Sequence, residues 1–276
     1  MLSPKLLCLA TLSTLPLVFG QGSADIASIK TAYTPKATSC PSDFQLVRSA
    51  GLTNQKLSPD ESSYVSSRQS DVLPGAWKTY LSNVQATNVS LPDYVGSILS
   101  GGSNGSSLPT LGIATSGGGY RAAIFGAGIL NALDGRNTTS TGAGTGGLLQ
   151  AATYLSGLSG GSWLVTSAMQ ANFPTFQEVV FGPGNGSKVS PSGFGGWNTQ
   201  FDLTAPNNNT AKDLSFIFNA LTEVSGKVGV GFPVTITDVW ARLLSRHFVN
   251  GTQGSNFFGN DTTHGAGVLL SQIANT

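Results

Sequence analysis

Apolar residues along the chain form short dense runs separated by glycine-rich and polar stretches. The run at 111–115 is too short for a helix and predicts a buried strand, whereas the longer apolar stretch at 122–133 predicts a helix. A second apolar run at 148–158 predicts another strand, followed by a helix at 160–171. Strands that alternate with helices favour an α/β fold, a layered sheet with helices on both faces.

Weaker patterns flank this central region. Helical spacing predicts further helices at 65–73, 77–84, 214–224 and 239–248, and Pro74 punctuates the first two. Segments rich in glycine, serine and threonine predict loops at 101–107, 135–147 and 181–198.

The first twenty residues form a separate unit. Lys5 supplies a positive charge, residues 6–19 are mostly apolar, and Gly20 places a small side chain where a signal peptidase cleaves, so 1–20 predicts a secretory signal peptide. A membrane anchor is the alternative. It needs about 18 or more apolar residues, and Pro16 interrupts this shorter run.

Composition predicts one substantial core after this segment. Residues 21–39 are small and polar without periodicity and predict an exposed leader, and 40–276 predict a single large domain. The 14 Lys and Arg residues against 13 Asp and Glu give a net charge of +1. That balance argues against nucleic-acid binding, which shows as a clustered basic excess.

Asn-x-Ser/Thr sequons predict N-linked glycans and independently support a secreted or cell-surface protein. They lie at Asn88, Asn104, Asn137, Asn185, Asn208, Asn250 and Asn260. Only 10% of the residues are charged, so attached sugars would supply solubility. Chance in a chain rich in Asn, Ser and Thr is the alternative for some of them.

Two glycine-rich motifs follow the two predicted strands. GLSGG (157–161) fits the G-x-S-x-G pattern, in which a serine nucleophile sits on a tight turn from strand to helix. The glycines of SGGGYRA (116–122) place backbone N–H groups at a helix N-terminus, and serine acyl transfer needs such donors for its oxyanion. Ser159 is therefore the predicted nucleophile, with Gly117 and Gly118 as the oxyanion hole. A tight packing turn is the alternative for these glycines.

Arg121 is the unusual residue of the first motif, because it carries a fixed positive charge near the start of an apolar helix. A guanidinium can hold a phosphate by two hydrogen bonds. A lipase for neutral fats has no use for such a cation, whereas a phospholipid esterase has. Pairing with a nearby carboxylate is the alternative.

SGGGYRA followed by TYLSGLSGGSW resembles the fungal secreted lysophospholipase, or phospholipase B, family, which is related to cytosolic A2-type phospholipases and to patatin. The likeness runs from Cys40 through 146–150 to 172–174, more than half of the mature chain. The resemblance implies a patatin-like or cytosolic-phospholipase-like catalytic domain.

The resemblance also implies roles for the motif residues. Ser159 matches the nucleophile, Gly117 and Gly118 the oxyanion hole, and Arg121 the ligand of the substrate phosphate. It implies hydrolysis of fatty-acyl esters of phospholipids and lysophospholipids at a membrane or micelle surface, often with transacylase activity. The family needs no metal or cofactor for the chemical step.

One part of the family's pattern is missing. Its catalytic aspartate lies far downstream in an Asp-Gly-Gly-like turn, but the only Asp-Gly here, at Asp134, precedes Ser159. Four aspartates follow the serine without a glycine after them: Asp202, Asp213, Asp238 and Asp261. Cys8 leaves with the signal peptide, so Cys40 also lacks a partner. We therefore expect an N-terminal fragment with both missing groups beyond Thr276, and little hydrolysis by these 276 residues alone.

Two other interpretations stay open. Ser159, Asp238 and His264 follow the chain order of an α/β-hydrolase esterase or lipase, but this triad leaves Arg121 unexplained. His247 lies in a helical pattern, and the two histidines match no metal-ligand spacing. A non-catalytic cell-surface glycoprotein would account for the composition and the sequons, but it would not explain the two glycine motifs or Arg121.

Overall fold

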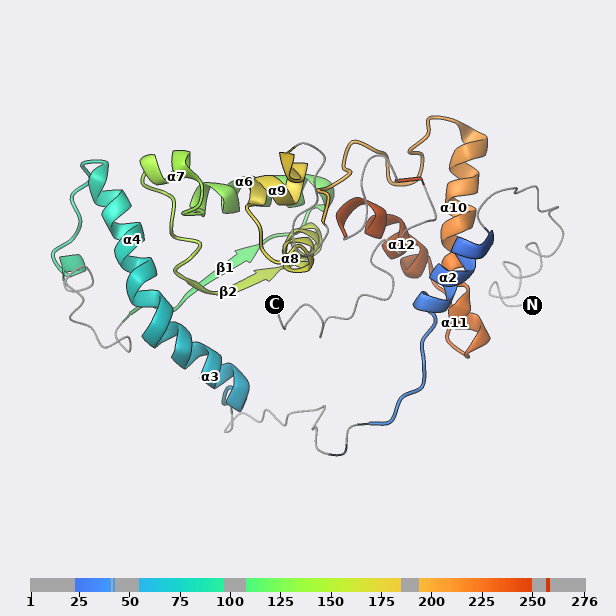
Figure 1. Ribbon diagram of the computed structural model, residues 1–276, viewed down its shortest axis with the longest axis horizontal. Coiled ribbons are helices and arrows are strands. Elements are labelled where there is room, and N and C mark those ends of the chain that lie inside the picture. Colours follow the sequence, from blue (N-terminus) through green and yellow to red (C-terminus); the bar gives the residue numbers. More distant parts are fainter. Residues whose placement is uncertain are drawn as a thin grey trace, which may run out of the picture.

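The computed structural model describes residues 23–40, 42, 55–96, 108–184, 194–249 and 257–258, so the predicted signal peptide lies outside the described residues. In Figure 1 a small sheet has helices beside it, and a second group of helices lies away from the strands. In chain order the elements are α2 (Ser23–Tyr33), α3 (Pro59–Ser67), the π-helical turn η1 (Arg68–Val72), α4 (Leu73–Ala86), β1 (Leu111–Thr115), α6 (Gly119–Leu133), α7 (Thr138–Gly142), β2 (Ala152–Gly157), α8 (Gly160–Gln170), α9 (Phe176–Phe181), α10 (Thr210–Val224), α11 (Gly226–Gly229) and α12 (Ile236–Phe248).

The sheet of the described residues consists of β1 and β2, which pair in parallel with Ile113 opposite Leu155. These two side chains pack on the core formed by α6 and α8. Tyr154 is the neighbour of Leu155 and points to the other side of the strand. There it meets Tyr64 of α3 edge-to-face, with ring centroids 6.4 Å apart. Helices therefore contact both sides of the strands, which is compatible with the predicted α/β class. The patatin-like layering stays a prediction.

Most predicted elements are present. The strand at 111–115 has the predicted bounds, and the helices predicted at 122–133, 160–171, 214–224 and 239–248 correspond to α6, α8, α10 and α12. The predicted strand at 148–158 is shorter. Residues 146–151 form a turn, in which the N–H of Leu149 bonds to the Leu133 carbonyl rather than to a neighbouring strand.

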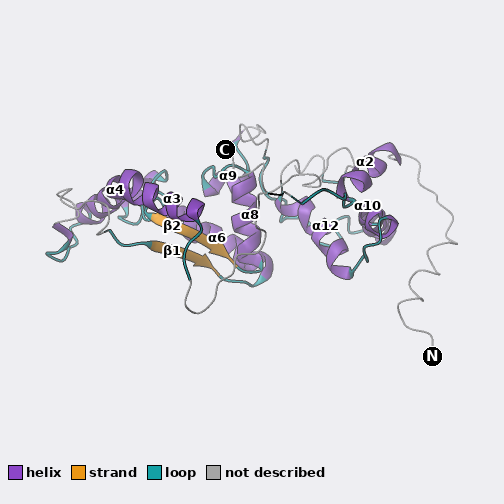
Figure 2. Cartoon of the chain, turned by 90° about the horizontal axis from the view of Figure 1, so that it is seen from below, coloured by secondary structure: helices purple, strands orange, loops and turns teal. Residues whose placement is uncertain are grey.

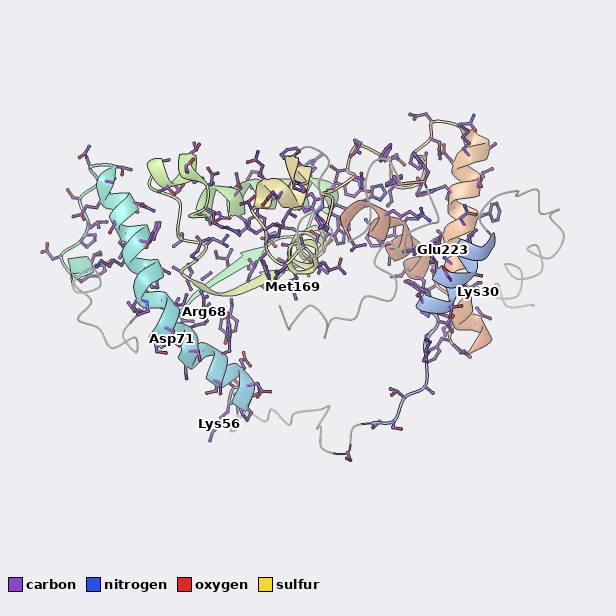
Figure 3. The ribbon with its side chains drawn as sticks, viewed as in Figure 1. Lys30, Lys56, Arg68, Asp71, Met169 and Glu223 are labelled. Atoms are coloured by element: carbon purple, nitrogen blue, oxygen red, sulfur yellow. The ribbon has the colours of Figure 1, made fainter. Side chains whose placement is uncertain are left out.

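The predicted break at Pro74 is wrong, because η1 joins α3 to α4 and the helix continues through it. Pro74 lies in the first turn of α4, where a missing N–H costs least. The π-helical turn also presents Arg68, whose guanidinium donates to the carbonyls of Gln150 and Ala152 at 2.8 and 2.5 Å (Figure 3). These hydrogen bonds connect the continuous helix α3–η1–α4 to the start of β2. Figure 2 shows α3 and α4 along one side of the strands.

The exposed leader predicted at 21–39 also differs from the structure, since residues 23–33 form α2. Ile29 is 1% exposed, and α2 packs against α10 and α11. Ile26, Ile29 and Tyr33 recur at helical spacing, and Tyr33 packs on the core cluster that α10 and α12 form. The other residues of α2 are small or polar, so tertiary packing of these few apolar side chains holds the helix.

A buried group of charges joins α10 to α12. Glu223 bonds to Arg242 at 2.5 Å and to Arg246 at 2.9 Å, and all three side chains are almost completely excluded from solvent. Arg246 also donates to the Phe257 carbonyl and lies over the Phe216 ring. We call these three residues the buried charge cluster.

Candidate active site

Ser159 lies on a strained turn between β2 and α8. Its backbone has φ 51° and ψ −121°, a positive φ that non-glycine residues seldom adopt and that is common at functional sites. Ser159 occupies the N-cap position of α8, yet its side chain makes no capping hydrogen bond. It is exposed. The hydroxyl is thus held at the start of a helix and open to a substrate.

Glycines allow this turn because backbone comes too close for any side chain. A Cβ atom at Gly161 would lie 2.4 Å from the Thr115 carbonyl oxygen, and one at Gly157 would lie 2.4 Å from the Gly161 carbonyl oxygen. Thr115 also ties the turn together, since its hydroxyl donates to the Gly161 carbonyl at 3.1 Å and its own carbonyl accepts from the Leu158 N–H.

Replacing Gly161 by alanine is therefore expected to destabilise the protein by about 1–3 kcal/mol, because the added methyl group overlaps backbone that cannot rotate away. The matched control is Gly128→Ala on the outer side of α6, where a Cβ would meet nothing within 4 Å. That change is expected to be neutral or stabilising by up to about 1 kcal/mol. Urea denaturation midpoints measure both, and equal midpoints for the two variants would contradict the steric account.

The predicted oxyanion glycines lie beside the predicted nucleophile. A Cβ at Gly117 would lie 2.9 Å from Cβ and 3.5 Å from Oγ of Ser159. Gly118 is the N-cap of α6 with φ 137°, a conformation that side chains disfavour. The N-termini of α6 and α8 also touch, since a Cβ at Gly160 would lie 2.2 Å from the Gly119 carbonyl oxygen. Both helix N-termini carry partial positive charge, which suits a developing oxyanion.

Arg121 is exposed in the first turn of α6. A cation there opposes the helix dipole at a cost of roughly 0.3–1 kcal/mol. Within the described part of the chain, no hydrogen bond or ion pair involves its guanidinium, so the alternative of a structural carboxylate partner has no support there. A helix that accepts such a charge beside two N–H donors is suited to binding an anionic group.

Three of the aspartates that follow Ser159 are engaged elsewhere. Asp202 accepts the N–H groups of Thr204 and Ala205, which lower its pKa. Asp213 accepts from Asn207. Asp238 caps α12 and bonds to Lys227 at 2.5 Å, which holds its pKa below the usual value. Each stabilises a turn or a helix end, so the Asp238 alternative lacks a free carboxylate; Asp261 and His264 lie outside the described residues.

His247 is a core residue rather than a base for Ser159. Its Nδ1 is 2.9 Å from the Leu243 carbonyl of its own helix, and its ring contacts Tyr120 and Phe257. Burial lowers the pKa of this imidazole below its usual value. The surrounding aromatic cluster was not predicted from sequence. It includes Trp163 of α8, which contacts Trp240 of α12.

The remaining predicted residues are dispersed. Among the sequons, Asn88 and Asn208 are exposed, whereas Asn137 caps α7 by accepting the N–H groups of Thr139 and Ser140. Asn104, Asn185, Asn250 and Asn260 lie outside the described residues. Cys40 is exposed and has a free thiol.

Comparison with known proteins supplies an independent finding. A family described as the lysophospholipase catalytic domain matches residues 111–263, which include both glycine motifs. Lysophospholipase 1 of Aspergillus fumigatus is 41% identical over 224 residues, 80% of this chain and 33% of that protein. Lysophospholipase 2 of the same fungus is 39% identical over 227 residues, 80% of this chain and 35% of that protein. The lysophospholipase of Arthroderma benhamiae is 35% identical over 256 residues, 88% and 37% of the two chains. The chain thus spans about a third of the length of these relatives. No solved structure shows a significant match.

Proposed function

The chain belongs to the lysophospholipase catalytic-domain family, and from that premise we propose that the native protein hydrolyses fatty-acyl esters of lysophospholipids and phospholipids through an acyl-enzyme on Ser159. The observation that carries the proposal is the contact between Gly117 and Ser159 at the touching N-termini of α6 and α8. A nucleophile and N–H donors must meet at one ester carbonyl in serine acyl transfer.

The proposed steps follow from these positions. Ser159 Oγ attacks the acyl carbonyl, and the N–H groups of Gly117 and Gly118 donate to the oxyanion. The serine proton passes to an aspartate outside the described residues and then to the leaving glycerol oxygen. Water, activated by the same carboxylate, hydrolyses the acyl-enzyme to free fatty acid, and a second lysophospholipid in place of water gives transacylation. Arg121 holds the phosphate throughout.

We also propose that the protein is secreted, carries N-linked glycans and works transiently at a membrane or micelle surface. The apolar N-terminal segment and the exposed sequons at Asn88 and Asn208 support this location. In the part of the chain that the structure describes, no helix has both the length and the apolarity that crossing a bilayer requires.

The role of Arg121 gives the test of the substrate class. Replacing it by glutamine in the native protein is expected to lower kcat/KM for a lysophospholipid about 10- to 100-fold, because a charge-assisted hydrogen bond to phosphate is lost. The kcat/KM of Arg121→Lys should lie between those of the native protein and of Arg121→Gln, because lysine keeps the positive charge but lacks the planar guanidinium. Hydrolysis of an ester that carries the same acyl chain without phosphate should change less than about threefold.

Lys78→Gln is the matched control, because this exposed lysine lies on α4 and has no described bond of its side chain. It should leave both substrates unaffected. If Arg121→Gln lowers kcat/KM equally for the lysophospholipid and for the ester without phosphate, Arg121 does not bind the substrate phosphate. Background turnover of both substrates by the unmodified native protein would instead favour the non-catalytic glycoprotein.

A further inference from the structure

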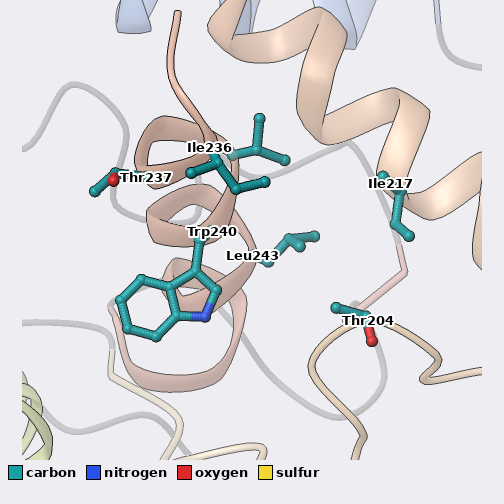
Figure 4. Close-up of a pocket in the computed structure, with 7 residues that line it drawn as sticks. Thr204, Ile217, Ile236, Thr237, Trp240 and Leu243 are labelled. Atoms are coloured by element: carbon teal, nitrogen blue, oxygen red, sulfur yellow. The ribbon is translucent and has the colours of Figure 1, made fainter.

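An apolar groove is lined by residues of α10 and α12. In Figure 1 these two helices lie on the far side of α8 from the strands. It has a volume of about 490 Å³, within the range of small-molecule sites. Its lining is aliphatic and aromatic, with two threonines and no titratable side chain: Thr204, Ile217, Ile236, Thr237, Val239, Trp240 and Leu243. Figure 4 shows Ile217 and Leu243 on opposite helices, extending into the space between them.

Large apolar side chains stay in water at the edge of this groove. Ile236 is 83% exposed and Trp240 is 42% exposed. Leaving such surface in water beside an apolar hollow is unfavourable, and exposed apolar patches of this kind mark binding sites. Among the described residues that line the groove none is a cation, and this lining is unsuited to a phosphate or a carboxylate headgroup.

Two tryptophan side chains connect the groove to the helix that begins at the predicted nucleophile. Trp240 packs on Trp163 with ring centroids 5.7 Å apart. Trp163 lies one helical turn after Ser159 on α8. A single ring contact and one turn of helix thus separate the groove from the serine that would hold the acyl group.

We propose that this α10–α12 groove binds the hydrocarbon chain of a fatty acyl group. The inference rests on the proposed function for the identity of the ligand, because a phospholipid esterase must accommodate such a chain. A hydrocarbon chain fits the chemistry of the lining, which offers contact area and no charge. Trp240 would cover the chain at the edge that faces the catalytic helix.

The test measures binding without catalysis, using 9,10-dibromostearate, whose bromines quench tryptophan fluorescence on contact. The native protein should be quenched in a saturable way, and Trp240→Phe should remove most of that quenching. Ile236→Ser should weaken binding about tenfold or more, whereas Phe181→Ser, which alters an 80% exposed side chain on α9, should not. Palmitate should displace the probe more than 50-fold better than decanoate, because each added methylene strengthens apolar burial about two- to fourfold.

Two outcomes would refute the proposal that the groove binds an acyl chain. Quenching that persists undiminished in Trp240→Phe would locate the chain elsewhere. A fatty-acid-free dimer that Ile236→Ser dissociates would make this surface a contact between two copies. Failure of the proposed function is distinguishable, because Ser159→Ala should bind the probe normally. If the native protein binds the probe in the groove but has no esterase activity, the proposal of an acyl-chain groove stands and the proposed hydrolysis is refuted.

Discussion

Alanine at position 159 is expected to reduce hydrolysis of lysophospholipid by the native protein about 10⁴-fold or more. Loss of the attacking oxygen removes the acyl-enzyme route entirely, and removal of a serine nucleophile in other hydrolases costs up to about 10⁶-fold. The change should leave the fold intact, because serine and alanine tolerate the positive φ of this turn about equally. Initial rates on a micellar lysophospholipid measure the effect, and covalent labelling by a fluorophosphonate should disappear with it.

Ser156→Ala is the matched control, since this serine is exposed on β2 three residues before the nucleophile. Its rate and its labelling should stay within about twofold of the native protein. Mapping of the fluorophosphonate adduct to any serine other than Ser159, or activity above a tenth of the native rate in Ser159→Ala, would refute the assignment of the nucleophile.

Glu223→Ala is expected to destabilise the protein by about 3–5 kcal/mol, the largest loss of stability among the substitutions proposed. It leaves the guanidinium groups of Arg242 and Arg246 in a buried site without the carboxylate that neutralises them. Because natural domains have only about 5–15 kcal/mol of total stability, this loss is a large fraction of the total and should lower the urea midpoint strongly. Urea denaturation followed by circular dichroism measures the effect.

Asp93→Ala supplies the control, because this carboxylate is exposed and its loss should change stability by less than about 0.5 kcal/mol. A second variant separates charge from packing. Replacing Glu223, Arg242 and Arg246 together by leucine, methionine and leucine should recover most of the loss, because no charge is then buried. Equal stability of Glu223→Ala and Asp93→Ala would mean that water reaches the buried charge cluster.

Much of the candidate site could be predicted from the sequence because its geometry is local. A serine between glycines after a short apolar run specifies a turn whose steric limits involve neighbours in the chain, and the structure has that turn at Ser159. The three glycines after 111–115 likewise indicate backbone that approaches something closely. That Gly117 approaches Ser159 is a long-range contact, which the parallel pairing of β1 and β2 creates.

Other features depended on contacts that no local pattern contains. The few apolar residues around Ile29 are a weak indication of a helix, because the helix α10 on which they pack is far away in the chain. From the sequence alone, Glu223 and Arg246 would be expected on the surface. They are buried because α10 and α12 pack against each other. The groove beside Trp240 combines side chains of α10 and α12, which are distant in the chain. Short-range sterics and apolar runs thus determined the strands, the main helices and the two glycine turns. Packing between distant segments decided which charges are buried, where α2 lies and where the α10–α12 groove forms.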